Sequence, residues 1–296
     1  MEHVRWLNEP TLRTPTVVYA FTGWNDAGDA ASSALRTMVE QWGAQAVAEI
    51  DPEPFTDFAT VRPHVLIADG KRTIVWPTVG IWSASLPGGD VLLVLGPEPA
   101  MRWRLFCEQL LGVAERYGAA MTISLGALLA DVPHTRPVHI IGTASDPELV
   151  ERFQLQRSRY EGPTGIVGVL HDVLATSGVS TASLWAAVPG YAAQIPAAKA
   201  ALALVERASA LIGAPAESET LRAAAGEYDA RIAALIADDQ ELIDYVSRLE
   251  SMVDDERTAF DHEDQDDDDD VTGHPPLDAS GGDELVAEVE RFLRDQ

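Results

Sequence analysis

The sequence predicts an α/β protein of three layers, in which helices flank a mostly parallel sheet. Two observations lead to this prediction. Short apolar runs rich in β-branched residues alternate with amphipathic helical segments from residue 17 to residue 212. These apolar runs are nearly continuous, as expected of parallel strands that are buried on both faces. With 296 residues, 46% of them apolar, the chain is long enough for one large domain with an appendage.

The first predicted unit is a strand, a helix and a second strand. Residues 16–21 form an apolar run that stops at Thr22-Gly23, which is typical of a buried strand. Apolar residues then recur at helical spacing over residues 30–42, and residues 45–50 supply the next strand. Within one sheet, this order implies a right-handed parallel crossover.

A β-hairpin and a further series of strands and helices follow. Residues 64–68 and 72–76 lie on either side of Asp69-Gly70, a dipeptide that suits a turn with positive φ. After the hairpin the alternation resumes. We expect strands at residues 90–95, 120–125, 138–142 and 180–188, and helices at residues 100–117, from 147, 165–176 and 197–212.

The C-terminal third of the chain is predicted to begin as a helical arm. Apolar side chains lie along one side of residues 221–253, where they cover a flank of the domain or mediate assembly. We therefore expect an α/β domain at residues 1–253, with its helical arm at about 195–253. Residues 254–282 are expected to form a disordered acidic linker, because eight of the ten residues 261–270 are acidic and like charges repel.

The last residues, 283–296, are expected to form a short amphipathic helix. Two alternatives remain open for it. It is a frayed end that folds weakly on its own domain, or it docks in a groove of this protein or of a partner. The partner-binding side chains, which share helical spacing, are Leu285, Val289, Phe292 and Leu293.

The charge balance excludes several kinds of partner. The chain has 21 basic and 47 acidic residues, a net charge of −26. We expect no nucleic-acid partner, because binding phosphates needs a basic face, and no membrane partner, because anionic lipid repels acids. Residues 254–296 hold 17 acids and three bases, so a partner recruited by charge is expected to be basic and to meet this segment.

The expected location is the cytoplasm. The N-terminus lacks an apolar run behind its charges, which argues against a signal peptide. No stretch approaches the roughly 20 apolar residues that span a bilayer. Cys107 is the single cysteine and lies in an amphipathic pattern, which indicates a buried, inert thiol.

The first candidate ligand site follows the first strand. The spacing of Gly23 and Gly28 resembles a phosphate-binding loop, but Asp29-Ala30 replaces its Lys-Ser/Thr pair, which argues against a nucleotide. Ligands of open α/β sheets bind beyond the carboxyl ends of strands. The candidate ligand-binding residues here are Gly23, Trp24, Asn25 and Asp26. The alternative is that Asp26 caps the following helix and Trp24 packs.

Two further loops contain candidate site residues. A helix is expected to start at Gly162, Pro163, Thr164 and Gly165, and its free N–H groups would attract an anion. The alternative is a simple helix cap. The loop after the strand near Leu129 combines an imidazole, a hydroxyl and a guanidinium in His134, Thr135 and Arg136. The alternative for His134 is an ordinary surface residue.

Metal and cofactor sites are not expected. The sequence has no paired His or Cys spacing for zinc. The acidic run at Asp266 has Val271 and Leu277 where a calcium loop needs Gly and Glu. Thr122 stands where a nucleophile elbow around Ser124 needs Gly, so this template fails as well.

Five segments in order along the chain carry a family resemblance. They are residues 21–28 (FTGWNDAG), 96–99 (GPEP, followed by Arg102, Trp103 and Phe106), 130–137 (ADVPHTRP), 160–166 (YEGPTGI) and 183–189 (SLWAAVP). Together they resemble the proteasome assembly chaperone 2 family, in its actinobacterial branch. The resemblance implies a phosphorylase/hydrolase-like fold, self-association and, from archaeal and eukaryotic relatives, binding to proteasome subunits. It implies no catalytic residues.

Two positions depart from the pattern of the family that the chain resembles. Gly190 precedes Tyr191 where the family commonly has His. The chain ends with Arg294-Asp295-Gln296, whereas chaperones that dock in proteasome pockets often end with a hydrophobic residue, Tyr and one more residue. This second departure argues against that mode of docking.

Two functions follow from these observations. The favoured one is a non-enzymatic assembly or interaction protein, because no catalytic motif is complete. The alternative is a small-molecule hydrolase or transferase that acts on a nucleoside-like substrate, with a pocket at the strand ends. In that case His134, Arg136 and Asp26 are the catalytic candidates, and they would line one pocket with the turn at residues 162–165.

Overall fold

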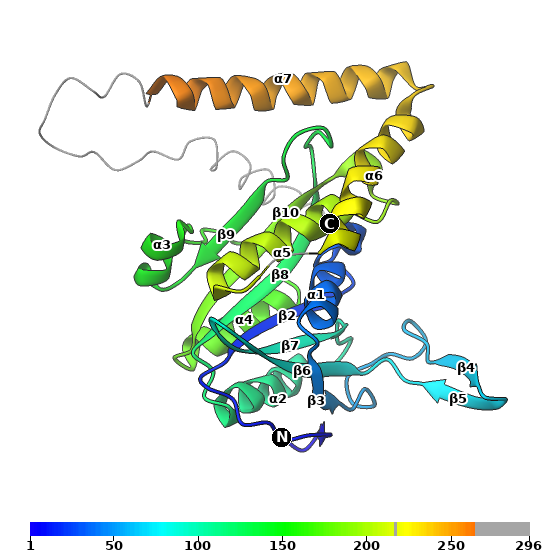
Figure 1. Ribbon diagram of the computed structural model, residues 1–296, viewed down its shortest axis with the longest axis vertical. Helices are drawn as coiled ribbons and strands as arrows, with labels where there is room; N and C mark the ends of the chain where they lie inside the picture. Colours follow the sequence, from blue (N-terminus) through cyan, green and yellow to red (C-terminus); the bar gives the residue numbers. More distant parts are fainter. Residues whose placement is uncertain (216–217, 264–296) are drawn as a thin grey trace, which may run out of the picture.

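An eight-stranded sheet forms the centre of the molecule, with helices on both of its faces (Figure 1). The computed structural model describes residues 1–215 and 218–263 of the chain. The strands follow the order β1-β3-β6-β7-β2-β8-β10-β9 across the sheet. Their bounds are Val4–Trp6 (β1), Thr16–Thr22 (β2), Gln45–Ile50 (β3), Val79–Leu86 (β6), Gly89–Pro97 (β7), Met121–Ala130 (β8), Ile140–Ala144 (β9) and Ser180–Pro189 (β10).

The centre of the sheet is parallel and its two sides are antiparallel. Strands β7, β2, β8 and β10 pair in parallel, and the strands outside them pair antiparallel. The predicted α/β fold is therefore confirmed, with its parallel strands in the centre. Strand β3 runs in the direction of β2, as predicted, but β6 and β7 lie between the two. Strands β1 and β6 were not predicted, because glycine and serine interrupt the apolar residues of β6 and β1 has only three residues.

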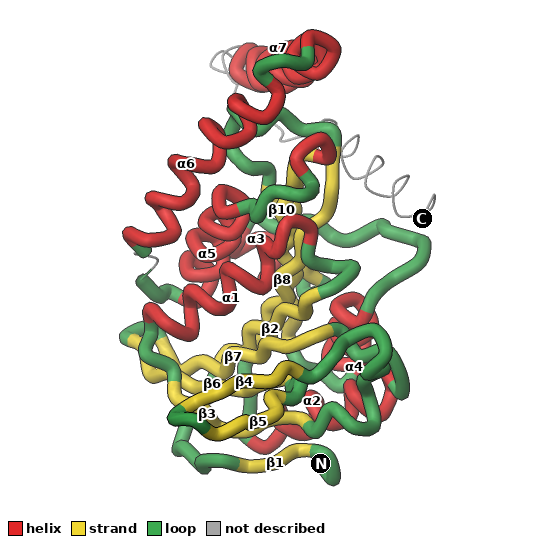
Figure 2. The backbone as a smooth tube through the Cα atoms, turned by 90° about the vertical axis from the view of Figure 1, so that its right-hand side faces the viewer, coloured by secondary structure: helices red, strands yellow, loops and turns green. Residues whose placement is uncertain are grey.

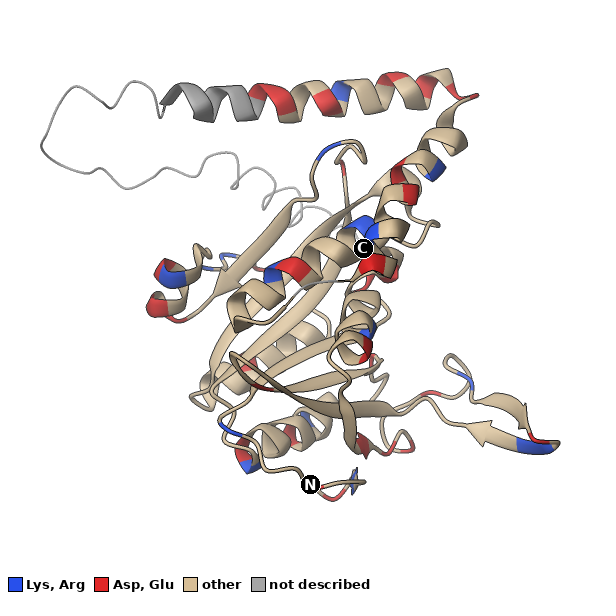
Figure 3. Cartoon of the chain, in the orientation of Figure 1, with Lys and Arg blue, Asp and Glu red and all other residues tan. Residues whose placement is uncertain are grey.

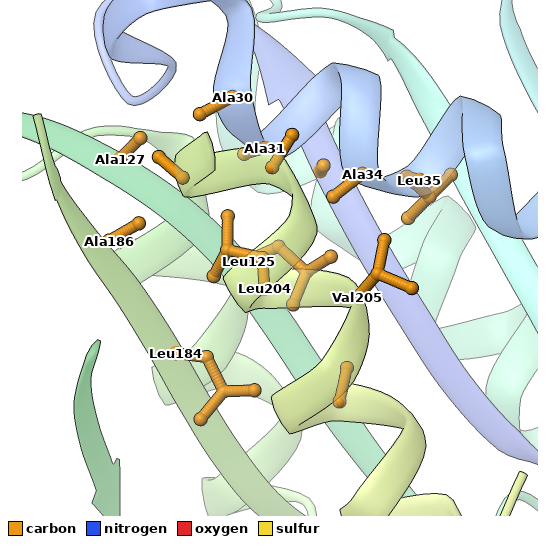
Figure 4. Packing of buried hydrophobic residues seen from close by; sticks show 14 of the residues in the cluster. Ala30, Ala31, Ala34, Leu35, Leu125, Ala127, Leu184, Ala186, Leu204 and Val205 are labelled. Atoms are coloured by element: carbon orange, nitrogen blue, oxygen red, sulfur yellow. The ribbon is translucent and has the colours of Figure 1, made fainter. Parts of the chain in front are cut away.

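Two layers of helices cover the sheet (Figure 2). Helices α1 (Ala30–Gln41) and α5 (Ala198–Ile212) pack on one face, and helices α2 (Trp103–Arg116) and α4 (Ile166–Thr176) pack on the other. Figure 4 shows Leu125 of β8 and Leu184 of β10 in the cluster with α1 and α5. Burial of one such leucine stabilises the fold by about 2–3 kcal/mol. The neighbouring Ser124 points to the opposite face, because side chains alternate along a strand.

The predicted hairpin is confirmed. Strands β4 (His64–Ala68) and β5 (Lys71–Val75) pair with each other antiparallel and form a sheet of their own. Asp69 and Gly70 both have positive φ, 51° and 73°, as the turn requires. The hairpin extends away from the central sheet (Figure 1, cyan).

The predicted helical arm is two helices instead of one. Helix α6 (Glu219–Ile236) and helix α7 (Gln240–Glu263) are separated by three residues. Asp239 causes the second start, because its carboxylate accepts a hydrogen bond from the Leu242 N–H at 3.1 Å. Within the described residues, no helix has the length and apolar character required to cross a membrane.

Helix α7 also corrects the predicted start of the acidic linker. The helix continues through Asp254 to Glu263, so residues 254–263 are helical where a disordered segment was predicted. Asp254 contributes to this extension, because its carboxylate is held by Arg136. The rest of the predicted linker and the predicted helix at 283–296, with Leu285, Val289, Phe292 and Leu293, lie outside the described residues.

An ion pair ties the N-terminal segment to the start of β7. The Asp90 carboxylate accepts hydrogen bonds from the Arg13 guanidinium at 3.1 and 3.3 Å and from the Arg13 backbone N–H at 2.6 Å. These bonds, those of the side chain first, lower the pKa of Asp90 to about 2.

The low pKa of Asp90 predicts a specific loss of stability in acid. Its carboxyl group has an ordinary pKa of 3.8, so the stabilisation is complete above that pH and is lost as the pH falls toward 2. We expect Asp90→Asn to be less stable than the wild type near neutral pH, and the difference in unfolding free energy to shrink in acid. Urea denaturation at a series of pH values measures this difference. If the difference in unfolding free energy stays constant with pH, the pKa of Asp90 is not lowered by its contact with Arg13.

Candidate functional site

The predicted site residues gather at one edge of the sheet. Strands β2, β7, β8 and β10 run in parallel, so their carboxyl ends lie at the same edge (Figure 1). The loops after these four strands contain Asn25, Glu98, His134 and Tyr191 respectively. The hydrogen bonds of these loops divide the residues into two groups, one next to α4 and α1 and one next to α7.

The first group joins the loop after β2 to the start of α4. Asn25, only 1% exposed, donates a hydrogen bond through Nδ2 to Glu98 Oε1 at 3.0 Å. The Ile166 N–H at the start of α4 donates to the same oxygen at 2.9 Å. Gly165 is required here, because a Cβ at this position would lie 2.4 Å from Asn25 Nδ2. The structure therefore brings Asn25 and the turn at residues 162–165 together.

The ligand of this turn is a side chain of the same protein. The turn was predicted to attract an anion, and the Glu98 carboxylate accepts the first N–H of α4. Sequence reasoning did not assign Glu98 to the site. Its position directly after β7, at the carboxyl edge, is the signal that identifies it.

Asp26 is committed to helix α1. Its Oδ1 accepts hydrogen bonds from the backbone N–H groups of Ala31 at 2.8 Å and Ser32 at 3.0 Å. These are the contacts of the helix-capping alternative. Burial raises the pKa of Asp26, although the bonds from Ser32 and Ala31 oppose this shift. Its second oxygen, Oδ2, is buried without a hydrogen-bond partner.

Gly23 and Trp24 lie between β2 and Asn25. Gly23 has a φ of 127°, which favours glycine, and a Cβ there would contact the side chain of Glu98. The Trp24 side chain is 41% exposed, so it does not pack in the core. No contact described in the structure assigns Trp24 a role.

The second group holds His134 in place. The backbone N–H of His134 donates to the Tyr191 hydroxyl oxygen, and its ring Nδ1 lies 2.8 Å from the same oxygen. Lys199 Nζ donates to the His134 carbonyl oxygen and to Asp229 Oδ2. His134 is only 4% exposed, and burial lowers its pKa. The lowered pKa favours the neutral ring, which shares a hydrogen bond with the Tyr191 hydroxyl at Nδ1; the ring tautomer sets which of the two atoms donates.

Arg136 fastens helix α7 to this loop. The guanidinium binds the Asp254 carboxylate in a bidentate manner, with Nε to Oδ1 at 2.8 Å and Nη2 to Oδ2 at 2.6 Å. Its Nη1 lies 3.5 Å from Glu250 Oε1, and Thr135 Oγ1 donates to the same Glu250 oxygen. Tyr245 of α7 donates through its hydroxyl to Asp131. The loop at residues 131–136 is therefore a clamp on α7.

The catalytic candidates thus lie at the same edge of the sheet, but they bind different hydrogen-bond partners. In the described part of the chain, Asp26 bonds to α1, whereas His134 and Arg136 bond to residues of α5, α7 and the short helix η2 (Gly190–Ala192). Among the same residues, no group of three or more His, Cys, Asp or Glu side chains is arranged to hold a metal ion. The arrangement joins helices to the sheet edge.

Loss of the Arg136 guanidinium is expected to loosen α7. We expect amide hydrogen exchange over residues 245–254 to become several-fold faster in Arg136→Ala, because the ion pair with Asp254 is lost. The difference should shrink in high salt, since the pair is partly exposed. Arg231→Ala, on the exposed side of α6, is the control. Unchanged exchange in Arg136→Ala would show that the ion pair is dispensable and that the other contacts of α7, among them those of Tyr245 and Glu250, hold the helix.

Comparisons with known proteins agree on one family. The model of the PAC2 family matches residues 20–236, a range that contains all five segments singled out in the sequence. A PAC2 family protein from Streptomyces avermitilis is 43% identical, with a TM-score of 0.74 over 78% of this chain and 99% of that chain. A proteasome-assembly chaperone homologue from Mycobacterium tuberculosis is 41% identical, with a TM-score of 0.71 over 78% and 99% of the two chains.

A more distant structure shares the fold alone. The archaeal proteasome activator PbaB from Pyrococcus furiosus is 16% identical, with a TM-score of 0.65 over 78% of this chain and 97% of that chain. No protein of curated function matches the chain.

Proposed function

The chain belongs to the PAC2 family, and from this premise we propose that it is a non-enzymatic assembly protein of the proteasome-assembly-chaperone type. It binds protein partners, proteasome subunits among them, through the α/β body and through residues 283–296. It acts in the cytoplasm and associates with itself. The mycobacterial relative described as a proteasome-assembly chaperone homologue supports the choice of partner.

One observation carries the non-enzymatic part of the proposal. The three catalytic candidates of the enzyme alternative are each held by another part of the protein: Asp26 by α1, His134 by the Tyr191 hydroxyl, and Arg136 by α7. A catalytic acid or base has to face its substrate within hydrogen-bond reach. The hydrolase or transferase alternative requires these side chains to give up their present partners first.

Reconstitution with purified proteasome subunits tests the proposal. The α and β subunits of the organism that encodes the chain are mixed with and without the full chain, and assembly is followed on native gels. We expect the chain to migrate with α-subunit intermediates and to accelerate the formation of complete particles. Absence of both effects would refute the proposed partner.

A truncated chain separates the two proposed binding surfaces. Residues 1–263 retain α7 and its contact with Arg136, so the described fold is left intact. If residues 283–296 contribute to binding, this variant binds the subunits more weakly than the full chain. Equal binding would assign the interaction to the α/β body alone.

A further inference from the structure

The β4–β5 hairpin exposes apolar side chains on both of its faces. Val65 and Ile74 are direct cross-strand partners on one face, and Ile67 lies beside them. Leu66 and Val75 point to the other face, because side chains alternate along a strand. Their exposed fractions range from 42% for Val75 to 77% for Ile67.

Such a hairpin needs a cover that the described chain does not provide. Within the described residues this sheet contains only β4 and β5, and every residue of both strands is exposed. An isolated two-stranded hairpin is marginally stable in water. Contiguous apolar surface on a folded protein marks an interaction site.

The charge of the hairpin restricts the choice of partner. Residues 62–76 contain Arg62, Lys71 and Arg72 but only one acid, Asp69, in a chain of net charge −26. In Figure 3 the ribbon at the outer end of the hairpin is blue, the colour of Lys and Arg. Arg72 stands directly opposite Ile67, so the tip combines positive charge with an apolar side chain that is 77% exposed. An acidic surface with apolar contacts is complementary to this tip.

The same chain carries such a surface at the root of the hairpin. A cleft of about 440 Å³ reaches Trp76, the residue that follows β5. Among the described residues, its lining has four acids, Glu2, Glu49, Asp51 and Glu53, against one Lys or Arg, which is Arg5. Since Arg5 pairs with Glu49, the cleft retains negative charge. Its apolar contacts are Val4, Pro52 and Trp76.

We propose that the β4–β5 hairpin is a self-association arm, whose basic, apolar tip enters the acidic cleft of a second copy of this chain. The inference rests on the self-association included in the proposed function and names its surface. It does not depend on the proteasome as partner.

The position of tip and cleft favours a second copy over any other occupant. They lie at opposite ends of one hairpin, whose five-residue strands span about 17 Å. When two hairpins cross antiparallel about a two-fold axis, each tip reaches the cleft of the other copy. The apolar faces of the two hairpins then cover each other, which is the self-complementary arrangement of a symmetric dimer.

Charge reversal on each side tests the contact. The tip variant combines Lys71→Glu with Arg72→Glu, and the cleft variant combines Glu2→Lys with Glu53→Lys, both at exposed positions. Sedimentation of the full chain over a concentration series measures the dissociation constant. We expect each variant alone to associate at least about tenfold more weakly than the wild type, because like charges then meet. An equimolar mixture of the two variants should associate again, since each tip then meets a cleft of opposite charge.

Two controls separate this contact from general charge effects and misfolding. Arg36→Glu with Arg104→Glu changes the net charge as much as the tip variant does, at exposed positions outside the hairpin, and should associate like the wild type. Recovery in the mixture shows that both variants are folded.

The outcomes distinguish failure of the arm from failure of the proposed function. A wild type that is monomeric at every concentration refutes self-association and the arm together. A wild type that associates while the tip variant associates equally well refutes only the arm, as does a mixture that fails to recover. If the truncated chain of residues 1–263 no longer associates, the partner of the hairpin tip is the acidic C-terminal segment and not the cleft, which refutes the proposed contact. If the wild type binds phosphatidylserine vesicles and the tip variant does not, the partner of the hairpin tip is a membrane surface, which also refutes the proposed contact. The reconstitution with proteasome subunits is read independently of all these results.

Discussion

Replacement of Glu98 by alanine is expected to lower the free energy of unfolding by about 2–4 kcal/mol. The Glu98 carboxylate accepts hydrogen bonds from Asn25 and from the first N–H of α4. Without it, the Asn25 amide is buried with no acceptor, and the positive end of the helix dipole loses its counter-charge. Urea denaturation near neutral pH measures the change.

Glu98→Gln is the matched control for this prediction. Glutamine keeps an oxygen that accepts both hydrogen bonds but removes the charge. We therefore expect a loss of about 1 kcal/mol or less, the typical contribution of a charge near a helix N-terminus. If Glu98→Ala is as stable as Glu98→Gln, the contact does not hold α4 in place.

Replacement of Asp26 by alanine is the second change with a large expected effect. Two N–H groups in the first turn of α1 lose their acceptor, at a buried position, which costs about 2–3 kcal/mol. Asp26→Asn keeps an oxygen for both bonds and removes the buried charge. We expect it to be within about 1 kcal/mol of the wild type near neutral pH.

The pH dependence of the same residue gives an independent check. Because burial raises the pKa of Asp26, the folded state favours the protonated carboxyl group. This contribution is complete below the ordinary pKa of 3.8 and is lost as the pH rises through the raised value. Relative to the wild type, Asp26→Asn should therefore gain stability as the pH rises. A gain as the pH falls would contradict a raised pKa.

These two residues also show how the sheet edge has been used. In open α/β sheets the carboxyl ends of parallel strands are the usual place for a ligand. In this chain, Asp26 and Glu98 occupy the helix N-termini there as ligands that the protein itself provides. An edge closed by its own side chains is consistent with a protein that acts by binding other proteins.

Much of the fold was determined by the sequence alone, because the signals were local. Continuous apolar runs identified the central parallel strands β2, β7, β8 and β10. Asp69-Gly70 identified the hairpin, since only certain residues tolerate the positive φ that its turn requires. Strand β6 had no such signal, and it is a strand because β3 and β7 supply its hydrogen-bond partners. The five family segments were also visible in the sequence, and the match over residues 20–236 confirmed the family.

The roles of the polar residues, in contrast, were decided only by the tertiary structure. His134 meets Tyr191 across 57 positions of the chain, Glu98 meets Ile166 across 68, and Arg136 meets Asp254 across 118. No local pattern encodes such pairs. A histidine in a loop has the same sequence signature whether it faces a substrate or a tyrosine. The packing of the sheet and helices decides which segments meet, and so decides the partner of the histidine. In this chain, helices contact the residues that the sequence had suggested for a ligand.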